Sequence, residues 1–186
     1  MMICKPFLKA AAFVALMSLA HFGPAYSQSA AAADPTDAGK AVFKKANCMG
    51  CHKWHGNGGG GYGGDALSLR KTQLTKEQIV ETASCGRPGT GMPFFIRGAY
   101  DTVKCYGMDR KAIGDQIPPE GGTFLRPADI DAVADYVLAH IKGKGEPTYA
   151  ECTSFFSDTS RVCDVYKNAP PPAAAEGAGK TTDGKN

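Results

Sequence analysis

Two cysteines and a histidine stand together in the pentapeptide Cys48-Met49-Gly50-Cys51-His52. On one turn of helix, Cys48 and Cys51 occupy neighbouring positions of the same face, so both thiols can add to the two vinyl groups of one porphyrin. His52 then projects its imidazole at the iron. Because Cys-x-x-Cys-His is the attachment signature of c-type haem, the pentapeptide predicts one covalent haem c with its iron, held by Cys48, Cys51 and His52.

The same cysteine spacing also occurs in redox-active disulfides and in zinc sites. A thioredoxin-like site requires a strand-helix-strand pattern around the cysteines, and a zinc ribbon requires a second Cys-x-x-Cys pair. The sequence contains neither pattern. We therefore interpret the pentapeptide as a haem site.

The N-terminus has the pattern of an export signal. Two lysines precede a 13-residue apolar run that ends at Phe22, and Ala25-Tyr26-Ser27 follows, with small residues at the two positions that a signal peptidase reads. This pattern predicts a secretory signal peptide over residues 1–27, cleaved near Ser27, whose apolar run is too short to span a bilayer. We expect a periplasmic protein with no membrane span after cleavage, which agrees with the thioether attachment of haem.

The remaining cysteines predict disulfides. The chain has seven cysteines; Cys4 belongs to the predicted signal peptide and two belong to the pentapeptide. The other four are Cys85, Cys105, Cys152 and Cys163, an even number in an oxidising compartment. Three pairings are possible, and proximity in the sequence favours Cys85–Cys105 and Cys152–Cys163.

The net charge of the chain is too small to point to a highly charged partner. The formal charge of the whole chain is +3, and loss of the two lysines of the signal peptide would bring it closer to zero. So small a charge favours neither nucleic acid nor a membrane surface as a partner. We expect no nucleic-acid binding.

Helical patterns surround the pentapeptide. Thr36 or Asp37 is the expected cap of the first helix, and apolar residues at helical spacing make the last helix the clearest of the chain. Residues 56–64 are rich in glycine and are expected to form a loop that approaches the porphyrin edge. The chain between Arg97 and Gly122 is expected to be irregular. The expected helices are residues 38–47, a stretch from Thr75 to the break at 85–91, and a stretch from Pro127 to Gly143.

In the order of these features, the chain resembles the class I c-type cytochromes over about residues 37–142. The features are a first helix with Gly39 and Phe43, the haem pentapeptide, a Met-Pro pair at Met92, and a last helix with Tyr136. The resemblance implies an all-α fold, a small cytochrome c-like helical domain wrapped round one covalent haem. It further implies that the first and last helices cross at the glycine and aromatic positions, and that Met92 is the distal iron ligand.

Alternatives for the distal ligand remain at this point. Met108 is the competing methionine, and the Met-Pro context favours Met92. A cysteine ligand would require Cys85 or Cys105 to be unpaired. The chain also departs from the family pattern. Residues 63–65 stand where the family usually has a proline whose carbonyl holds the haem histidine, and the segment between Met92 and the last helix is unusually long.

The ligand set implies a function. With His52 and Met92 both bound, the iron has no open position for substrate, which describes an electron carrier without catalytic residues. The expected function is single-electron transfer from a periplasmic dehydrogenase to a respiratory oxidase or another cytochrome. The alternative is a catalytic haem subunit of a periplasmic oxidoreductase, in sulfur-compound oxidation or peroxide reduction.

Composition and motifs together predict how the chain is divided. Pro, Ala and Gly dominate its C-terminal end, which cannot bury enough apolar surface to fold. The predicted segments are a signal peptide (1–27), a flexible lead-in (28–36), the haem domain (37–142), a disulfide-clipped appendage (143–168) and a disordered tail (169–186).

Overall fold

The structure, a computed structural model, describes residues 35–61 and 64–168. The predicted signal peptide, most of the predicted lead-in and the predicted tail lie outside these described residues. None of the helices in the two ranges has the length and apolar character needed to cross a membrane.

Helices make up most of the regular structure, as the all-α prediction requires. The elements in chain order are α1 (Pro35–Lys45), α2 (Cys48–His52), β1 (Gly59–Gly61), β2 (Gly64–Ala66), α3 (Lys76–Cys85), α4 (Arg110–Ile113), the 3₁₀ helix η1 (Gly114–Gln116), α5 (Pro127–His140), α6 (Tyr149–Phe155) and the 3₁₀ helix η2 (Arg161–Tyr166).

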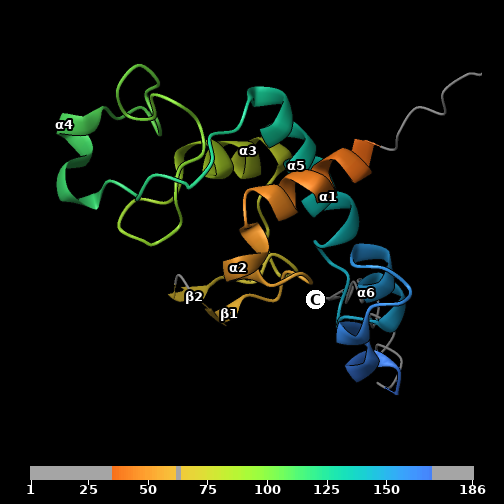
Figure 1. Cartoon of the computed structure of the whole chain (residues 1–186). Helices are drawn as coiled ribbons and strands as arrows, with labels where there is room; N and C mark the ends of the chain where they lie inside the picture. The colour runs from red at the N-terminus through yellow and green to blue at the C-terminus, as the bar shows by residue number, and fades with distance from the viewer. Residues whose placement is uncertain (1–34, 62–63, 169–186) are drawn as a thin grey trace, which may run out of the picture. The chain divides into compact units, whose positions relative to one another are not determined.

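Helices α1 and α5 cross in direct contact, and Figure 1 shows α1 in orange lying across α5 in teal. At the crossing, a Cβ on Gly39 would lie 2.1 Å from the carbonyl oxygen of Ala132 and 2.5 Å from Cβ of Tyr136. Only glycine allows this approach. The rings of Phe43 and Tyr136 are 5.7 Å apart beside it. The crossing expected from the family resemblance is therefore confirmed.

The buried apolar side chains form two clusters. The larger lies among α1, α3 and α5, and includes Phe43, Ile79 and Ile130. The smaller lies in the long segment between α3 and α5 and includes Tyr100, whose hydroxyl donates to the carbonyl of Cys85 at 2.9 Å. Full burial of one such side chain contributes about 1.5–3 kcal/mol, so each cluster is a source of stability in its own right.

The helix ends agree in part with the sequence. Helix α3 begins where the sequence predicts it, and Thr75 caps it in a capping box with Gln78. Helix α1 begins at Pro35, earlier than expected, so Thr36 and Asp37 lie in its first turn and the predicted cap is wrong. Proline is favoured at the first helical position because its fixed φ suits the helix, and Asp37 pairs with Lys40 at 2.8 Å instead of capping.

The glycine-rich stretch is not only a loop. Strands β1 and β2 pair as a small antiparallel hairpin within and just after the expected loop at 56–64. A Cβ on Gly58 would lie 2.1 Å from the carbonyl oxygen of Ala66, so close backbone approach occurs here within the hairpin itself. The segment 97–122, expected to be irregular, likewise contains α4 and η1; the side chain of Asp109 caps α4.

Both favoured disulfide pairings are confirmed: Cys85 bonds Cys105, and Cys152 bonds Cys163. Figure 1 shows α4, near the first disulfide, and α6, which carries Cys152, on opposite sides of the α1–α5 pair.

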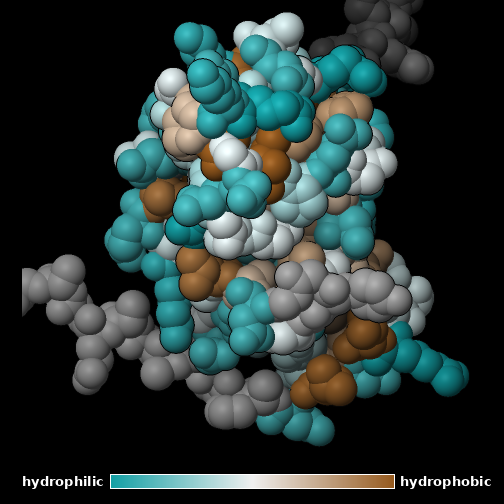
Figure 2. Space-filling model, turned by 90° about the vertical axis from the view of Figure 1, so that its left-hand side faces the viewer, coloured by the Kyte–Doolittle hydropathy of each residue, from teal (hydrophilic) through white to brown (hydrophobic). Residues whose placement is uncertain are grey.

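On the face drawn in Figure 2, hydrophobic side chains lie in small groups among hydrophilic ones. Most large apolar side chains of the described residues are buried in the two clusters, and Leu67, Val162 and Val165 are exposed.

Candidate functional site

The four predicted site residues meet at one cavity of about 350 Å³. Cys48, Cys51 and His52 line it from α2, and Met92 lines it from the segment after α3. Phe95 also borders the cavity and packs into the larger cluster. Residues that are far apart in the sequence therefore converge on a single space.

Helix α2 is bracketed by two non-glycine residues with positive φ. Asn47 before it has φ 56° and ψ 31°, and Lys53 after it has φ 62° and ψ 163°. The second conformation is close to glycine-only and costs on the order of 1–3 kcal/mol, so it persists only where the surroundings impose it. The Lys53 ammonium donates to the carbonyl of Gly60 at 2.7 Å, which ties the hairpin to this strained turn.

Cys48 and Cys51 are the described cysteines that remain outside disulfides, and both are half-buried. Burial raises the pKa of the Cys48 thiol to about 12, which keeps it protonated. A thiol adds across a vinyl group without an oxidant, since its hydrogen and sulfur go to the two carbons. The Cys85–Cys105 disulfide removes the cysteine-ligand alternative, because both of its candidates are paired.

The imidazole of His52 is held by the backbone. Its Nδ1 lies 3.0 Å from the carbonyl oxygen of Leu67. Burial lowers the pKa of His52, against the opposing effect of this hydrogen bond, so the ring is neutral. A neutral ring that donates from Nδ1 has its lone pair on Nε2, the nitrogen left for a metal. Leu67 thus supplies the carbonyl that the family usually takes from a proline.

Met92 is positioned by its own turn. Its backbone N–H donates to the hydroxyl of Thr90 at 3.2 Å, and its carbonyl accepts from the N–H of Arg87 at 3.2 Å. A Cβ on Gly86 would lie 2.6 Å from that carbonyl oxygen, so the turn closes only on glycine. These contacts hold the thioether of Met92 at the cavity.

Met108 and the two other histidines of the described ranges lie elsewhere. Met108 packs against the smaller cluster, around the Cys85–Cys105 disulfide. His55 and His140 line a second cavity, of about 420 Å³, between α1, α5 and α6. His140 is the last residue of α5 and stacks on Tyr136, with ring centroids 5.3 Å apart. The arrangement around the first cavity therefore favours Met92.

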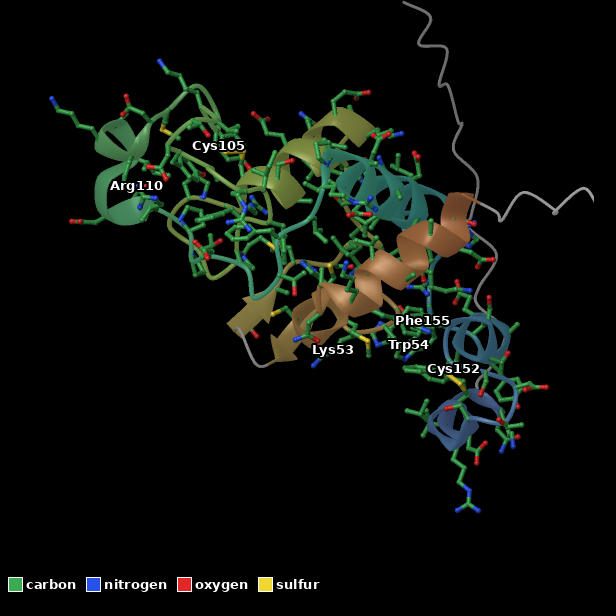
Figure 3. The ribbon with its side chains drawn as sticks, turned by 45° about the horizontal axis from the view of Figure 1, so that its top comes forward. Lys53, Trp54, Cys105, Arg110, Cys152 and Phe155 are labelled. Atoms are coloured by element: carbon green, nitrogen blue, oxygen red, sulfur yellow. A yellow bond between two sulfur atoms is a disulfide. The ribbon has the colours of Figure 1, made fainter. Side chains whose placement is uncertain are left out.

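Three residues near the site carried no signal in the sequence. The first is Leu67, which acts through a carbonyl that every residue has. The second is Trp54, whose ring packs on Phe155, Phe156 and Tyr166 of the C-terminal segment at 5.4–6.0 Å between centroids (Figure 3). The third is the buried Arg70, whose hydrogen bonds all depend on the tertiary fold.

The donor set fits a covalently attached haem. Two thiols on one face of a short helix can form thioethers, a neutral imidazole stands beside them, and a methionine lines the same cavity. Histidine nitrogen and methionine sulfur are the axial pair that suits an iron porphyrin engaged in electron transfer.

Comparison with known proteins gives one result that agrees with this chemistry. A family model described as Cytochrome c matches residues 36–140, more than half of the chain. The match runs from α1 to the end of α5 and includes all four cavity residues. Searches of curated proteins and of solved structures found no significant match.

Proposed function

The chain belongs to the cytochrome c family, and from this premise we propose that it is a periplasmic single-electron carrier. Family membership implies one covalent haem c with its iron, electron transfer rather than catalysis, and redox proteins as partners. In our proposal Cys48 and Cys51 form the thioethers, and His52 and Met92 are the two axial ligands.

A single observation carries the ligand assignment. The cavity between α2 and the segment after α3 is lined by both cysteines that lie outside disulfides, by His52 and by Met92. No other methionine of the described residues shares it: its lining contains Met92 alone of that type.

Haem c, when bound, supplies a one-electron couple whose potential is raised by a methionine ligand. The residues of the chain then have three tasks. The thioethers hold the group in place, the Leu67 carbonyl keeps the His52 ring in one orientation, and the turn at Met92 keeps the second ligand position closed to water and substrate. Ligands that stay fixed in both oxidation states minimise rearrangement during electron transfer.

The proposed partners are a periplasmic dehydrogenase as electron donor and a terminal oxidase or another cytochrome as acceptor. The export pattern over residues 1–27 supports the compartment. Two structures added to the helical core, the disulfide-tied segment after α3 and the C-terminal segment, support a dedicated partner, since a general shuttle needs neither.

The absorption spectrum of the oxidised protein tests this function. We expect a far-red charge-transfer band from methionine bound to iron. Met92→Ala should abolish the band and open the iron to added imidazole or cyanide, while the matched control Met108→Ala should keep it. Loss of the band in the control alone would assign the ligand to Met108. High-spin features in the unmodified protein would instead support the catalytic alternative.

A further inference from the structure

Arg70 is the one charged side chain among the buried residues of the described ranges, and its side chain is 3% exposed. Its guanidinium makes three hydrogen bonds. Nε donates to the carbonyl of His55 at 2.6 Å, Nη1 to the carbonyl of Gly145 at 2.7 Å, and Nη2 to the carboxylate of Glu151 at 3.0 Å. Arg70 thus joins the turn after the haem pentapeptide to the C-terminal segment.

Arg70 lies three residues after Leu67, in the same irregular segment that follows β2. The N–H groups of Leu69 and Arg70 both donate to the carbonyl of Gly56, at 2.7 and 3.4 Å. The carbonyl of Arg70 accepts from the N–H of Gly143 at 2.9 Å. The Leu67 side chain itself is 65% exposed and so gives its own carbonyl little support. The hairpin holds that carbonyl from one side, since Ala66 pairs with Gly59, and the anchor at Arg70 holds the chain on the other side.

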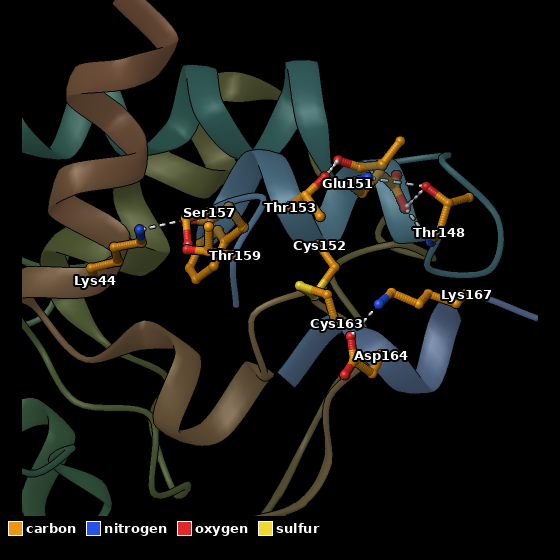
Figure 4. The surroundings of a disulfide bond; sticks show 12 residues. Lys44, Thr148, Glu151, Cys152, Thr153, Ser157, Thr159, Cys163, Asp164 and Lys167 are labelled. Atoms are coloured by element: carbon orange, nitrogen blue, oxygen red, sulfur yellow. Dashed lines mark hydrogen bonds and ion pairs between the residues drawn. A yellow bond between two sulfur atoms is a disulfide. The ribbon is translucent and has the colours of Figure 1, made fainter. Parts of the chain in front are cut away.

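Glu151, whose side chain is 28% exposed, is held by hydrogen bonds within its own segment. It is the third residue of α6, where its carboxylate accepts from the N–H of Thr148 at 2.9 Å in a capping box. The next residue, Cys152, forms the disulfide with Cys163, and Figure 4 shows Thr148, Glu151 and this disulfide in one small region. The carboxylate that neutralises Arg70 is thus fixed by a folded segment outside the family match.

We propose that Arg70 is a positioning residue for His52, and that the C-terminal segment acts on the haem site through it. Glu151 holds the guanidinium of Arg70, Arg70 holds residues 67–70 against the turn at 55–56, and this places the Leu67 carbonyl on Nδ1 of His52. The inference rests on the proposed function, in which His52 is the proximal ligand.

The consequence concerns the strength of one hydrogen bond. A carbonyl that accepts from the other ring nitrogen makes a histidine ligand more basic and fixes its orientation. A more basic ligand favours the oxidised metal, so this bond lowers the reduction potential. Loss of Glu151 leaves the buried Arg70 guanidinium without its charged partner, and loss of Arg70 removes all three of its hydrogen bonds. Either change loosens the segment and weakens the bond to His52. The potential should then rise.

Two substitutions test the anchor, because they change the charge in opposite directions. Arg70→Leu removes a positive charge and Glu151→Gln removes a negative one, while glutamine preserves the capping box. If charge alone acts, the potential falls in the first variant and rises in the second. Our inference expects the potential to rise in both variants. Arg70→Lys keeps the charge but carries it on a single nitrogen, so its potential should lie between those of Arg70→Leu and the unmodified protein.

A second measurement reports on His52 directly. Solvent exchange of its Nδ1 proton, followed by NMR in the reduced protein, should be about tenfold faster in Glu151→Gln, as expected when a charged hydrogen bond is lost. Lys44→Met is the matched control. The ammonium of Lys44 also binds the C-terminal segment, at the Phe155 carbonyl and ring, but it does not touch residues 67–70. This control should leave the exchange rate unchanged.

The outcomes separate the two proposals. If Arg70→Leu fails to fold, Glu151→Gln and Lys44→Met still decide the question. Three results would overturn the role of Arg70: unchanged proton exchange in Glu151→Gln, equal acceleration of exchange in Glu151→Gln and Lys44→Met, or potentials that follow charge alone. In each case the far-red band and covalent haem would still support the electron carrier. Loss of that band in the unmodified protein would instead overturn the proposed ligand set.

Discussion

Two disulfide-closed regions lie on opposite sides of the α1–α5 pair (Figure 1). We call residues 86–122 the distal loop and residues 143–168 the appendage. The Cys85–Cys105 disulfide closes 20 residues, and the distal loop has its own small apolar cluster. The Cys152–Cys163 disulfide closes 11 residues, and Phe155 of the appendage packs into the larger cluster of the main helices instead.

The two regions reach the haem site by different physical means. The distal loop contains Met92, so it acts through the covalent chain and backbone hydrogen bonds. The appendage contributes no residue to the cavity that Met92 lines, and it acts through side chains: the ion pair of the buried Arg70 with the partly exposed Glu151, and the aromatic contacts of Trp54. Connection through the chain survives most substitutions, whereas connection through one ion pair is lost with either partner. Each of the two axial positions that we propose is therefore supported by a region with its own weakness.

The largest expected effect comes from removing the two cysteines that we propose attach the haem. Cys48→Ala with Cys51→Ala should give a colourless and largely unfolded protein, because a domain of this size loses its main apolar core element without the porphyrin. Circular dichroism and a haem stain of the denatured protein measure the result. Extraction of haem from the unmodified protein by acidic organic solvent would contradict covalent attachment.

Opening the distal loop should have the next largest effect. In the chain-entropy model, Cys85→Ser with Cys105→Ser lowers the free energy of unfolding by about 3 kcal/mol. The Met92 segment then loses a restraint at each end, so exchange of the methionine ligand should occur at lower pH and the potential should fall. Titration of the far-red band with pH measures this. The Nδ1 proton of His52 should keep its slow exchange.

Opening the appendage should reverse this pattern. The Cys152–Cys163 disulfide closes a shorter loop. In the same model, Cys152→Ser with Cys163→Ser therefore lowers the free energy of unfolding by about 2.8 kcal/mol at most. The exchange of the His52 Nδ1 proton should accelerate, while the pH at which methionine is displaced stays unchanged. NMR and the pH titration together measure both sides. Identical responses in the two disulfide variants would remove the distinction between the regions.

The smallest effect is expected from an exposed ion pair in the distal loop. Arg110 binds Asp101 through two hydrogen bonds, of 2.8 and 2.9 Å, and these lower the pKa of Asp101 from 3.8. Because the folded pKa is the lower one, the pair stabilises the protein above about pH 4 and its contribution is lost as the pH falls through the folded pKa. Asp101→Asn should reduce stability slightly at neutral pH and by less at pH 2, as measured by urea unfolding at both pH values. A large loss at neutral pH would contradict the small contribution expected of an exposed pair.

The parts of this fold that depend on local patterns were predictable. The pentapeptide, the capping box at Thr75 and the helix that starts at Pro127 each depend on residues within a few positions of one another. The disulfide pairing followed from proximity along the chain. The crossing at Gly39 was predictable only through the family resemblance, since its steric reason lies on another helix.

The sequence by itself determined the kind of site: two thiols, an imidazole and a methionine with the chemistry of a haem protein, in a chain of mostly helical pattern. Only the tertiary structure decided which backbone carbonyl holds His52, which methionine faces the cavity, and what neutralises Arg70. The physical reason is that carbonyls are identical along the sequence, and a buried charge finds its partner 81 residues away. Such contacts form only when segments far apart in the chain pack together.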